Sequence, residues 1–155
     1  MTSDAPQPVL LLSRALVGTW SLLSRIDRTA VGAERVEPSL GAHPVALLFY
    51  DAAGHFAAQF MKRDRASVPA PASSTAAPNN SRAIGGYDAY FGTYTVDDER
   101  GTVTQRLLGA LSPESVGQVL TRGMEVSGDT LTIEVATASP AGEPVTRTLI
   151  WKRVG

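Results

Sequence analysis

Leu16-Val17-Gly18-Thr19-Trp20 is the stretch that decides the fold, because its Gly-x-Trp pattern opens the first long β pattern of the chain. A second tryptophan stands near the C-terminus, in Leu149-Ile150-Trp151-Lys152-Arg153. The first and last strands of a closed antiparallel barrel are neighbours, so a cation of the final strand can stack on Trp20 and cap the core. We expect Arg153 to be that cation, Gly18 to let the backbone pass close to the cap, and a helical turn over residues 13–16 to plug the opening.

Composition limits the classes of function. The 155 residues are enough for one domain with a sizeable core, and 43% of them are hydrophobic. A net charge of −1 gives no electrostatic attraction to nucleic acid or to an anionic membrane, so neither partner is expected. The chain has no cysteine, and its two histidines, His43 and His55, lack the spacing of metal ligands, so we expect no metal and no cofactor. The N-terminus has neither a signal-peptide pattern nor a membrane span, which predicts a cytoplasmic protein.

Turn signals divide the chain into eight predicted strands. Residues 1–8 are expected to form a disordered tail, residues 9–155 a single domain, and the Pro- and Ser-rich residues 64–81 a mobile loop within it. A short helix is predicted near residues 82–90, with Ser81 as its N-cap. The strands are predicted over residues 20–27, 45–50, 55–63, 91–96, 102–111, 117–126, 130–138 and 145–154. Short hairpins in up-and-down order predict an all-β barrel or sandwich, and an eight-stranded barrel has room for one small ligand.

Several of these segments together resemble the bacterial and fungal lipocalin-like domain, a small β-barrel of the wider lipocalin and fatty-acid-binding group. The resemblance covers nearly the whole chain. It is carried by Leu16-Val-Gly-Thr-Trp20, Pro44-Val-Ala-Leu-Leu-Phe-Tyr50, Gly54 through Gln59-Phe-Met61, Asp64-Arg65, Tyr87-Asp-Ala-Tyr-Phe-Gly-Thr-Tyr94, Gly101-Thr-Val-Thr104, Gly128-Asp-Thr-Leu131 and Leu149-Ile-Trp151. It implies an up-and-down lipocalin-like barrel, and relatives in the wider group include plain carriers as well as cofactor-free cyclases and isomerases.

The chain departs from the family at one position that bears on chemistry. The family often places a pair of histidines directly after Gly-Thr-Val-Thr, whereas this chain has Gln105-Arg106. Proton transfer by those histidines therefore has no residues to perform it here.

Strand alternation selects the side chains that face the interior. Taking Trp20, Leu131 and Trp151 as inward places Arg25 and Asp27 on the outer face of the first strand. The same alternation, extended strand by strand, predicts an inner face that holds Tyr50, Gln59, Met61, Arg63, Tyr94, Gln105, Arg122, Met124 and Arg147.

Arg122 is the most informative of these residues, because Leu120, Met124 and Val126 share its parity and make an apolar stripe. A buried guanidinium without a partner is very costly, so it must find a carboxylate, a carbonyl or a ligand oxygen. Glu134 should point outward and is a poor partner. The alternative interpretation is that Arg122 pairs with Tyr94, Gln59 or the backbone, or lies at the barrel mouth.

Amides and tyrosines complete the predicted site. Gln59 and Gln105 can orient a carbonyl or hydroxyl but cannot accept a proton at neutral pH, and either one can instead be bonded within the barrel. Tyr94 is a candidate donor to a developing oxyanion. Tyr90, with Tyr87, is a candidate lid over the mouth if both lie on one helix face, although packing of that helix on the rim is the alternative.

Two functional hypotheses follow. The first is a cofactor-free cyclase or isomerase of an apolar oxygenated metabolite, polyketide- or terpenoid-like, with Arg122, Tyr94 and Gln105 as catalytic residues. Tyr50, Gln59, Met61, Arg63, Tyr90, Met124 and Arg147 would then contact the ligand. The second is a non-catalytic carrier or binder of a hydrophobic small molecule, which needs the same cavity. A filled barrel that serves as an interaction protein is a third interpretation, and the chain is either a monomer or a homodimer.

Overall fold

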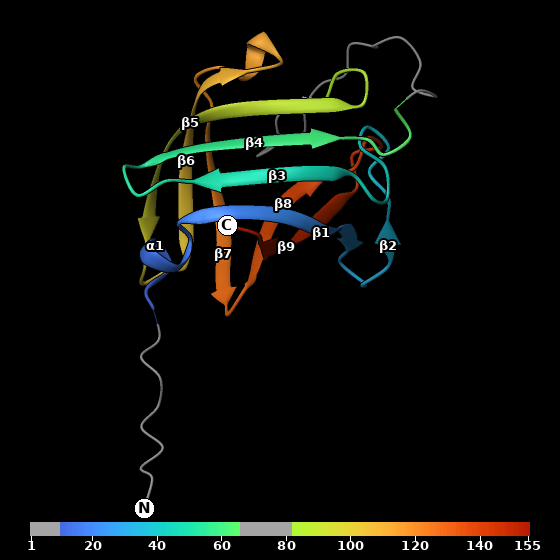
Figure 1. Cartoon of the computed structure of the whole chain (residues 1–155). Coiled ribbons are helices and arrows are strands. Elements are labelled where there is room, and N and C mark those ends of the chain that lie inside the picture. Colours follow the sequence, from blue (N-terminus) through green and yellow to red (C-terminus); the bar gives the residue numbers. More distant parts are fainter. Residues whose placement is uncertain (1–9, 66–81) are drawn as a thin grey trace, which may run out of the picture.

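The computed structural model describes residues 10–65 and 82–155 (Figure 1). The predicted tail of residues 1–8 lies outside the described residues, and only residues 64 and 65 of the predicted loop lie within them. The elements are α1 (Leu12–Ala15), β1 (Gly18–Thr29), β2 (Glu34–Arg35), β3 (Val45–Tyr50), β4 (His55–Met61), β5 (Tyr87–Asp97), β6 (Thr102–Ala110), the 3-10 turn η2 (Pro113–Ser115), β7 (Val119–Ser127), β8 (Thr130–Ala138) and β9 (Pro144–Arg153).

Eight of these strands close into an antiparallel barrel. The strands pair in the order β1-β3-β4-β5-β6-β7-β8-β9, and β1 also pairs with β9, so the sheet returns to its start. The two-residue β2 adds to β1 outside this circuit, pairing Asp27 with Arg35. The predicted eight-stranded up-and-down barrel is confirmed, and β2 is the one strand that the sequence did not predict.

The closing seam has the predicted Trp–Arg contact. Trp20 pairs with Arg153 across β1 and β9, and the Arg153 guanidinium lies 4.3 Å from the centre of the Trp20 ring. Arg153 also donates to the Val17 carbonyl over 2.8 Å and to the Ala15 carbonyl, which anchors the turn α1 beneath the barrel. Trp20 Nε1 donates to the Leu16 carbonyl over 2.9 Å. One cation therefore joins the first helix, the first strand and the last strand.

The predicted helix over residues 82–90 is wrong, because β5 begins at Tyr87. Gly85 and Gly86 both have positive φ, and they turn the chain into the strand. Two glycines inside a nine-residue helix would each cost about 1 kcal/mol relative to alanine, whereas tyrosine favours a strand. Tyr90 is therefore a strand residue within the barrel wall, and its predicted position on a helical lid does not exist.

A β-bulge in β1 reverses the alternation of that strand. The register with β9 shifts between Leu22 and Ser24, so that Trp20 before the bulge and Arg25 and Asp27 after it are all buried. The prediction that Arg25 and Asp27 face outward is therefore wrong. A single extra residue turns every following side chain to the other face, and here it brings a cation and an anion into the barrel.

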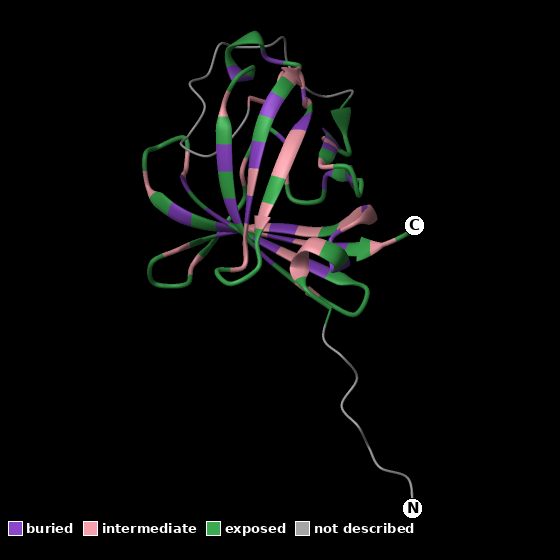
Figure 2. Cartoon of the chain, turned by 90° about the vertical axis from the view of Figure 1, so that its left-hand side faces the viewer, coloured by how far each residue is buried: buried purple, intermediate pink, exposed green. Residues whose placement is uncertain are grey.

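Burial alternates along the strands, as Figure 2 shows by its bands of buried and exposed residues. The core runs through the barrel from Trp20 at one end to Trp151 and Phe60 further along, whose rings meet edge to face at 5.7 Å between centroids. No helix among the described residues is long and apolar enough to cross a membrane.

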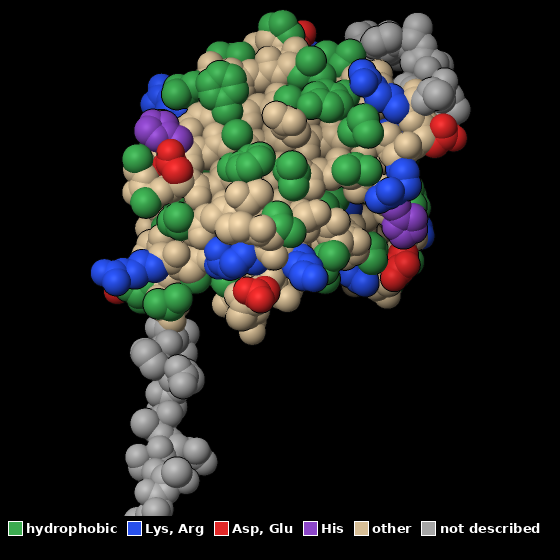
Figure 3. All heavy atoms as spheres, viewed as in Figure 1, with side chains coloured by type: hydrophobic (Ala, Val, Ile, Leu, Met, Phe, Trp, Pro, Cys, Tyr) green, Lys and Arg blue, Asp and Glu red, His purple; other side chains and the backbone are tan. Residues whose placement is uncertain are grey.

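Hydrophobic side chains also stand on the outer face of β3, β4 and β5 (Figure 3). Leu47 and Phe49 on β3 and Phe91 on β5 are exposed. Ala57 of β4 pairs with both Phe49 and Phe91, so the two aromatic residues flank it in one row. Apolar outer faces of this kind are found at protein interfaces. The homodimer nevertheless stays a prediction, because a single chain does not test it.

We predict that Gly18→Ala destabilises the barrel by at least about 2 kcal/mol. Gly18 has φ +145°, and an added Cβ would lie 2.5 Å from Arg153 Nη1 and 2.7 Å from the Gly155 carbonyl oxygen. The measurement is the free energy of unfolding in urea. Gly32→Ala is the matched control, because Gly32 also has positive φ but no atom within 4 Å of the added Cβ. Equal losses in both variants would contradict the close approach at Gly18.

Candidate functional site

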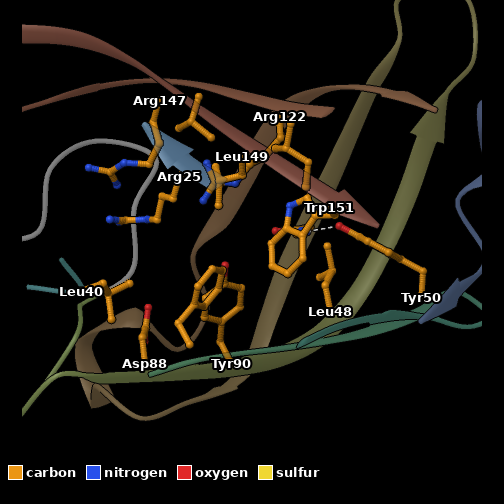
Figure 4. A pocket seen from close by; sticks show the side chains of 14 residues that line it. Arg25, Leu40, Leu48, Tyr50, Asp88, Tyr90, Arg122, Arg147, Leu149 and Trp151 are labelled. Atoms are coloured by element: carbon orange, nitrogen blue, oxygen red, sulfur yellow. Dashed lines mark hydrogen bonds between the residues drawn. The ribbon is translucent and has the colours of Figure 1, made fainter. Parts of the chain in front are cut away.

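A pocket opens inside the barrel between β5 on one wall and β1, β7 and β9 on the other (Figure 4). The volume of this cavity is about 40 Å³. The lining residues are Arg25, Leu40, Leu48, Tyr50, Phe60, Asp88, Tyr90, Gln105, Arg122, Ile133, Val135, Arg147, Leu149 and Trp151. Three arginines thus share a largely apolar cavity.

Arg147 is held by a buried ion pair. Its Nε and Nη2 donate to the two carboxylate oxygens of Asp27 over 2.8 and 3.0 Å, and both side chains are 3% exposed. The pair joins β9 to β1, where Asp27 and Arg147 stand opposite each other in the register. The two hydrogen bonds to Asp27 largely neutralise the positive charge of Arg147. The pair therefore forms part of the pocket wall, and the Arg147 guanidinium is less available to a ligand.

Arg25 is also paired, with a residue of the loop that follows β2. Its Nη2 lies 3.4 Å from Glu37 Oε1, and Leu40 of the same loop covers this end of the pocket. Burial, and then the nearby positive charge of Arg147, lower the pKa of Arg25 to about 10, while Glu37 and Asp27 act in the opposite direction. Arg25 therefore remains a cation at neutral pH.

Arg122 differs from the other two arginines. Its side chain points inward from β7, as predicted, and the residue is 7% exposed. The ion pairs among residues 10–65 and 82–155 engage Arg25 and Arg147 but not Arg122, and Arg122 Nη1 has no hydrogen-bond partner there. Arg122 is thus a buried cation among apolar side chains of β7, as predicted.

Two neutral side chains of the pocket also carry unsatisfied polar atoms. Trp151 Nε1 and Gln105 Oε1 are buried without a partner in the described part of the chain. Gln105 uses its amide nitrogen to donate to the Tyr50 hydroxyl over 2.6 Å, and that hydroxyl donates to Met124 Sδ over 3.8 Å. Gln105 and Tyr50 therefore face the interior as predicted, and the alternative in which Gln105 is bonded within the barrel also holds for its nitrogen.

Both pocket tyrosines stay protonated at neutral pH. Burial raises the pKa of Tyr50 far above its ordinary value, and the neighbouring Tyr90 adds to the effect. Burial also raises the pKa of Tyr90, while the positive charge and hydrogen bond of Arg122 oppose the rise. Each tyrosine thus offers a neutral hydroxyl, which can donate to a ligand oxygen but cannot act as a base.

Asp88 is the carboxylate of the opposite wall. It stands two residues before Tyr90 on β5, and it is 4% exposed. Figure 4 shows Asp88 and Tyr90 on one side of the pocket and the three arginines on the other. Asp88 could not be predicted as a pocket residue once residues 82–90 were expected to form a helix. Arg25 and Asp27 could not be predicted to face inward, because no residue pattern marks the bulge that turns them.

The prediction that Gln59, Met61 and Arg63 face the interior is wrong; the first two lie on β4, and Arg63 follows the end of that strand. Gln59 and Arg63 are exposed and Met61 is half-buried, because the inward positions of β4 are the even-numbered Phe56, Ala58 and Phe60. Gln59 accepts a hydrogen bond from the Tyr87 hydroxyl on the outer face, and Arg63 Nε donates to the His43 carbonyl. Phe56 and Phe60 could have indicated which side chains of β4 face the interior, because both are large hydrophobic residues at even-numbered positions.

Tyr94 and Met124 face inward but do not line the pocket. The Tyr94 ring packs edge to face on Tyr50 at 4.8 Å, and its hydroxyl donates to the Asp51 carbonyl in the turn between β3 and β4. The Tyr94 hydroxyl is thus bonded to a turn, and its role as donor to a ligand oxyanion stays a prediction. Glu134 is exposed on the outer face, as predicted.

The chemistry available in the pocket is hydrogen bonding and proton transfer. The described residues contain no group of three or more His, Cys, Asp or Glu side chains that could hold a metal ion. Arg122, Trp151 and Tyr90 are donors, Gln105 offers an acceptor oxygen, and Asp88 is a carboxylate. Such a pocket can orient an apolar molecule by its oxygen atoms.

The family model described as lipocalin-like domain matches residues 17–154. This range begins one residue before β1 and runs one residue past β9, so it covers the whole barrel and its seam. The chain matches no curated protein at a significant level.

We predict that Asp27→Asn costs about 3 to 5 kcal/mol in the free energy of unfolding, because it leaves the Arg147 charge buried without its partner. The double variant Asp27→Leu with Arg147→Met should recover most of that loss. The control is Glu34→Gln, which breaks the exposed Arg28–Glu34 pair between β1 and β2 and should cost less than about 1 kcal/mol. A double variant no more stable than Asp27→Asn would contradict the role assigned to the buried charge.

Proposed function

The chain belongs to the lipocalin-like domain family, and from that premise we propose that its barrel binds a small hydrophobic molecule in the pocket between β5 and β7. The observation that carries the proposal is a barrel interior that is not filled. Leu48, Phe60, Ile133 and Leu149 provide an apolar wall, and a few polar side chains stand among them. A largely apolar cavity with a small number of orienting groups is the usual form of a small-molecule site.

The size of the cavity limits the ligand. A cavity of about 40 Å³ is large enough for water but small for a whole hydrophobic ligand. The enclosed part therefore accommodates the polar end of a ligand and a small ring or short chain. A larger hydrophobic body must extend toward the mouth or displace side chains.

A second candidate function is cofactor-free isomerisation or cyclisation of an apolar oxygenated metabolite. The observation that favours it is the placement of Asp88 across the pocket from Arg122. A carboxylate can take a proton from a carbon next to a carbonyl, and a guanidinium can stabilise the enolate that forms. Gln105 keeps an orienting role in this reaction, whereas the Tyr94 hydroxyl is bonded to a turn.

The binding proposal predicts that Leu48→Phe weakens binding of a neutral probe, 2-naphthylmethanol, by tenfold or more, because the larger ring fills the cavity. Titration calorimetry measures the affinity, and circular dichroism checks the fold. Leu47→Phe is the matched control, because Leu47 is the adjacent residue of β3 and faces outward. Failure of the wild-type protein to bind the probe, together with a native mass spectrum free of any co-purified small molecule, would contradict binding in the barrel.

The catalytic proposal makes a separate prediction about Asp88→Asn, which keeps the shape of the side chain and removes its basicity. If a compound captured by the native protein is converted on incubation, this variant should lower the rate of conversion by about 100-fold or more. Its affinity for the compound should change little. The measurement is product formation by mass spectrometry, and a wild-type protein that returns its captured compound unchanged is a carrier.

A further inference from the structure

Three buried polar atoms of the pocket lack a partner among residues 10–65 and 82–155, and they differ in kind. Arg122 Nη1 and Trp151 Nε1 are hydrogen-bond donors, and Gln105 Oε1 is an acceptor. The residues are 7%, 1% and 3% exposed, so bulk water does not satisfy them. Buried polar atoms in native proteins are nearly always bonded to a protein group, a water molecule or a ligand, so these three atoms need partners inside the cavity.

The two other arginines of the pocket show what Arg122 lacks. Arg147 has both oxygens of Asp27 and Arg25 has Glu37, each within ion-pair distance. Arg122 has the Tyr90 hydroxyl beside it, a neutral group whose pKa is raised by burial. A water molecule in the cavity would satisfy the hydrogen bond of Nη1, but it would not balance the buried charge. An anionic oxygen does both, and such charge-assisted bonds are about twice as strong as neutral ones.

We propose that the ligand presents an anionic oxygen, as a carboxylate or an enolate, to Arg122 Nη1 and Trp151 Nε1. This inference rests on the proposed binding function and names the chemical class of its ligand. Both donors line the same pocket and come from different strands, β7 and β9, so the oxygen is held where these two walls meet the cavity. A hydroxyl of the same ligand meets Gln105 Oε1, whose amide is fixed by its bond to Tyr50.

Other titratable groups of the pocket are compatible with this assignment. Asp88 stands on the opposite wall, on β5, away from the strands that supply the two donors. Asp27 and Glu37 are occupied by Arg147 and Arg25. The anion therefore meets the one arginine of the pocket that no carboxylate of the described residues pairs with.

The experiment compares matched probes that differ only at the polar end. To test a carboxylate, titration calorimetry at pH 7.5 compares the affinity of the protein for 2-naphthoate with its affinity for 2-naphthylmethanol. To test an enolate, titration calorimetry at pH 9.5 compares the affinity for the enolisable 1-phenylbutane-1,3-dione with the affinity for 1-phenylbutan-1-one. We expect the wild-type protein to bind the anionic member of at least one pair tenfold or more tightly than its neutral partner. The preferred pair identifies the source of the oxygen.

Variants of single residues show which side chains cause the preference for the anionic probe. Arg122→Met should abolish it, so that this variant binds the anionic and the neutral probe of the pair with equal affinity. Trp151→Phe, which removes only the indole N–H and keeps an aromatic ring, should reduce it by about fivefold. Arg106→Met is the control, because Arg106 lies on the adjacent strand β6, is exposed, and carries the same charge; it should preserve the preference.

The outcomes separate the two proposals. Binding of neutral and anionic probes with equal affinity would overturn the anionic-oxygen inference and leave the binding function intact. The anionic-oxygen inference is also overturned if the preference for the anionic probe survives Arg122→Met or disappears in Arg106→Met. Absence of binding for all four probes, together with a native mass spectrum free of any co-purified small molecule, would overturn both. The wild-type comparison alone is decisive if Arg122→Met does not fold.

Discussion

Closure of the sheet between β1 and β9 is the constraint on which the rest of the structure depends. Arg153 makes this closure specific, because its guanidinium stacks on Trp20 and donates to carbonyls of the turn that precedes β1. The contact needs a backbone without a side chain at Gly18, where a Cβ would meet Arg153. Once the seam is closed in this register, every inward position of the barrel is determined, and with it the set of side chains that meet in the pocket.

The bulge in β1 gives the pocket its polar character. Without it, Arg25 and Asp27 would lie on the outer surface, and Arg147 would be a buried cation with no carboxylate on the neighbouring strand. With it, Arg147 and Asp27 form a neutral buried pair beside the cavity. A closed pair of this kind adds little to stability compared with apolar packing, but it fixes two walls of the pocket relative to each other. The strand irregularity and the site are thus one feature of the fold.

The parts of the barrel that could be predicted are those in which one residue pattern shows both that the segment is a strand and which of its side chains face the interior. Leu131 and Trp151 set the parity of β8 and β9, and Arg122 followed from the apolar stripe around it. The failures have local physical causes. Gly85 and Gly86 form a turn, and the sequence around them does not distinguish a helix from a strand. The bulge near Leu22 depends on how β1 pairs with β9, and no local sequence pattern predicts that pairing. The site residues missed for these reasons are Arg25, Asp27 and Asp88, so the sequence predicted two of the three pocket arginines and neither of these carboxylates.

Binding and catalysis draw on the same features of this pocket, and the distribution of charge is what distinguishes them. An anion held by Arg122 and Trp151 needs nothing from Asp88, and a carrier would be better without a carboxylate facing its ligand. Asp88 on the opposite wall suits a reaction in which the oxygen becomes anionic, because a base on one side and a cation on the other match proton removal and enolate formation. The two forms of the anionic oxygen therefore have different consequences: a preference for the enolisable probe favours a reaction, and a preference for the carboxylate favours a carrier.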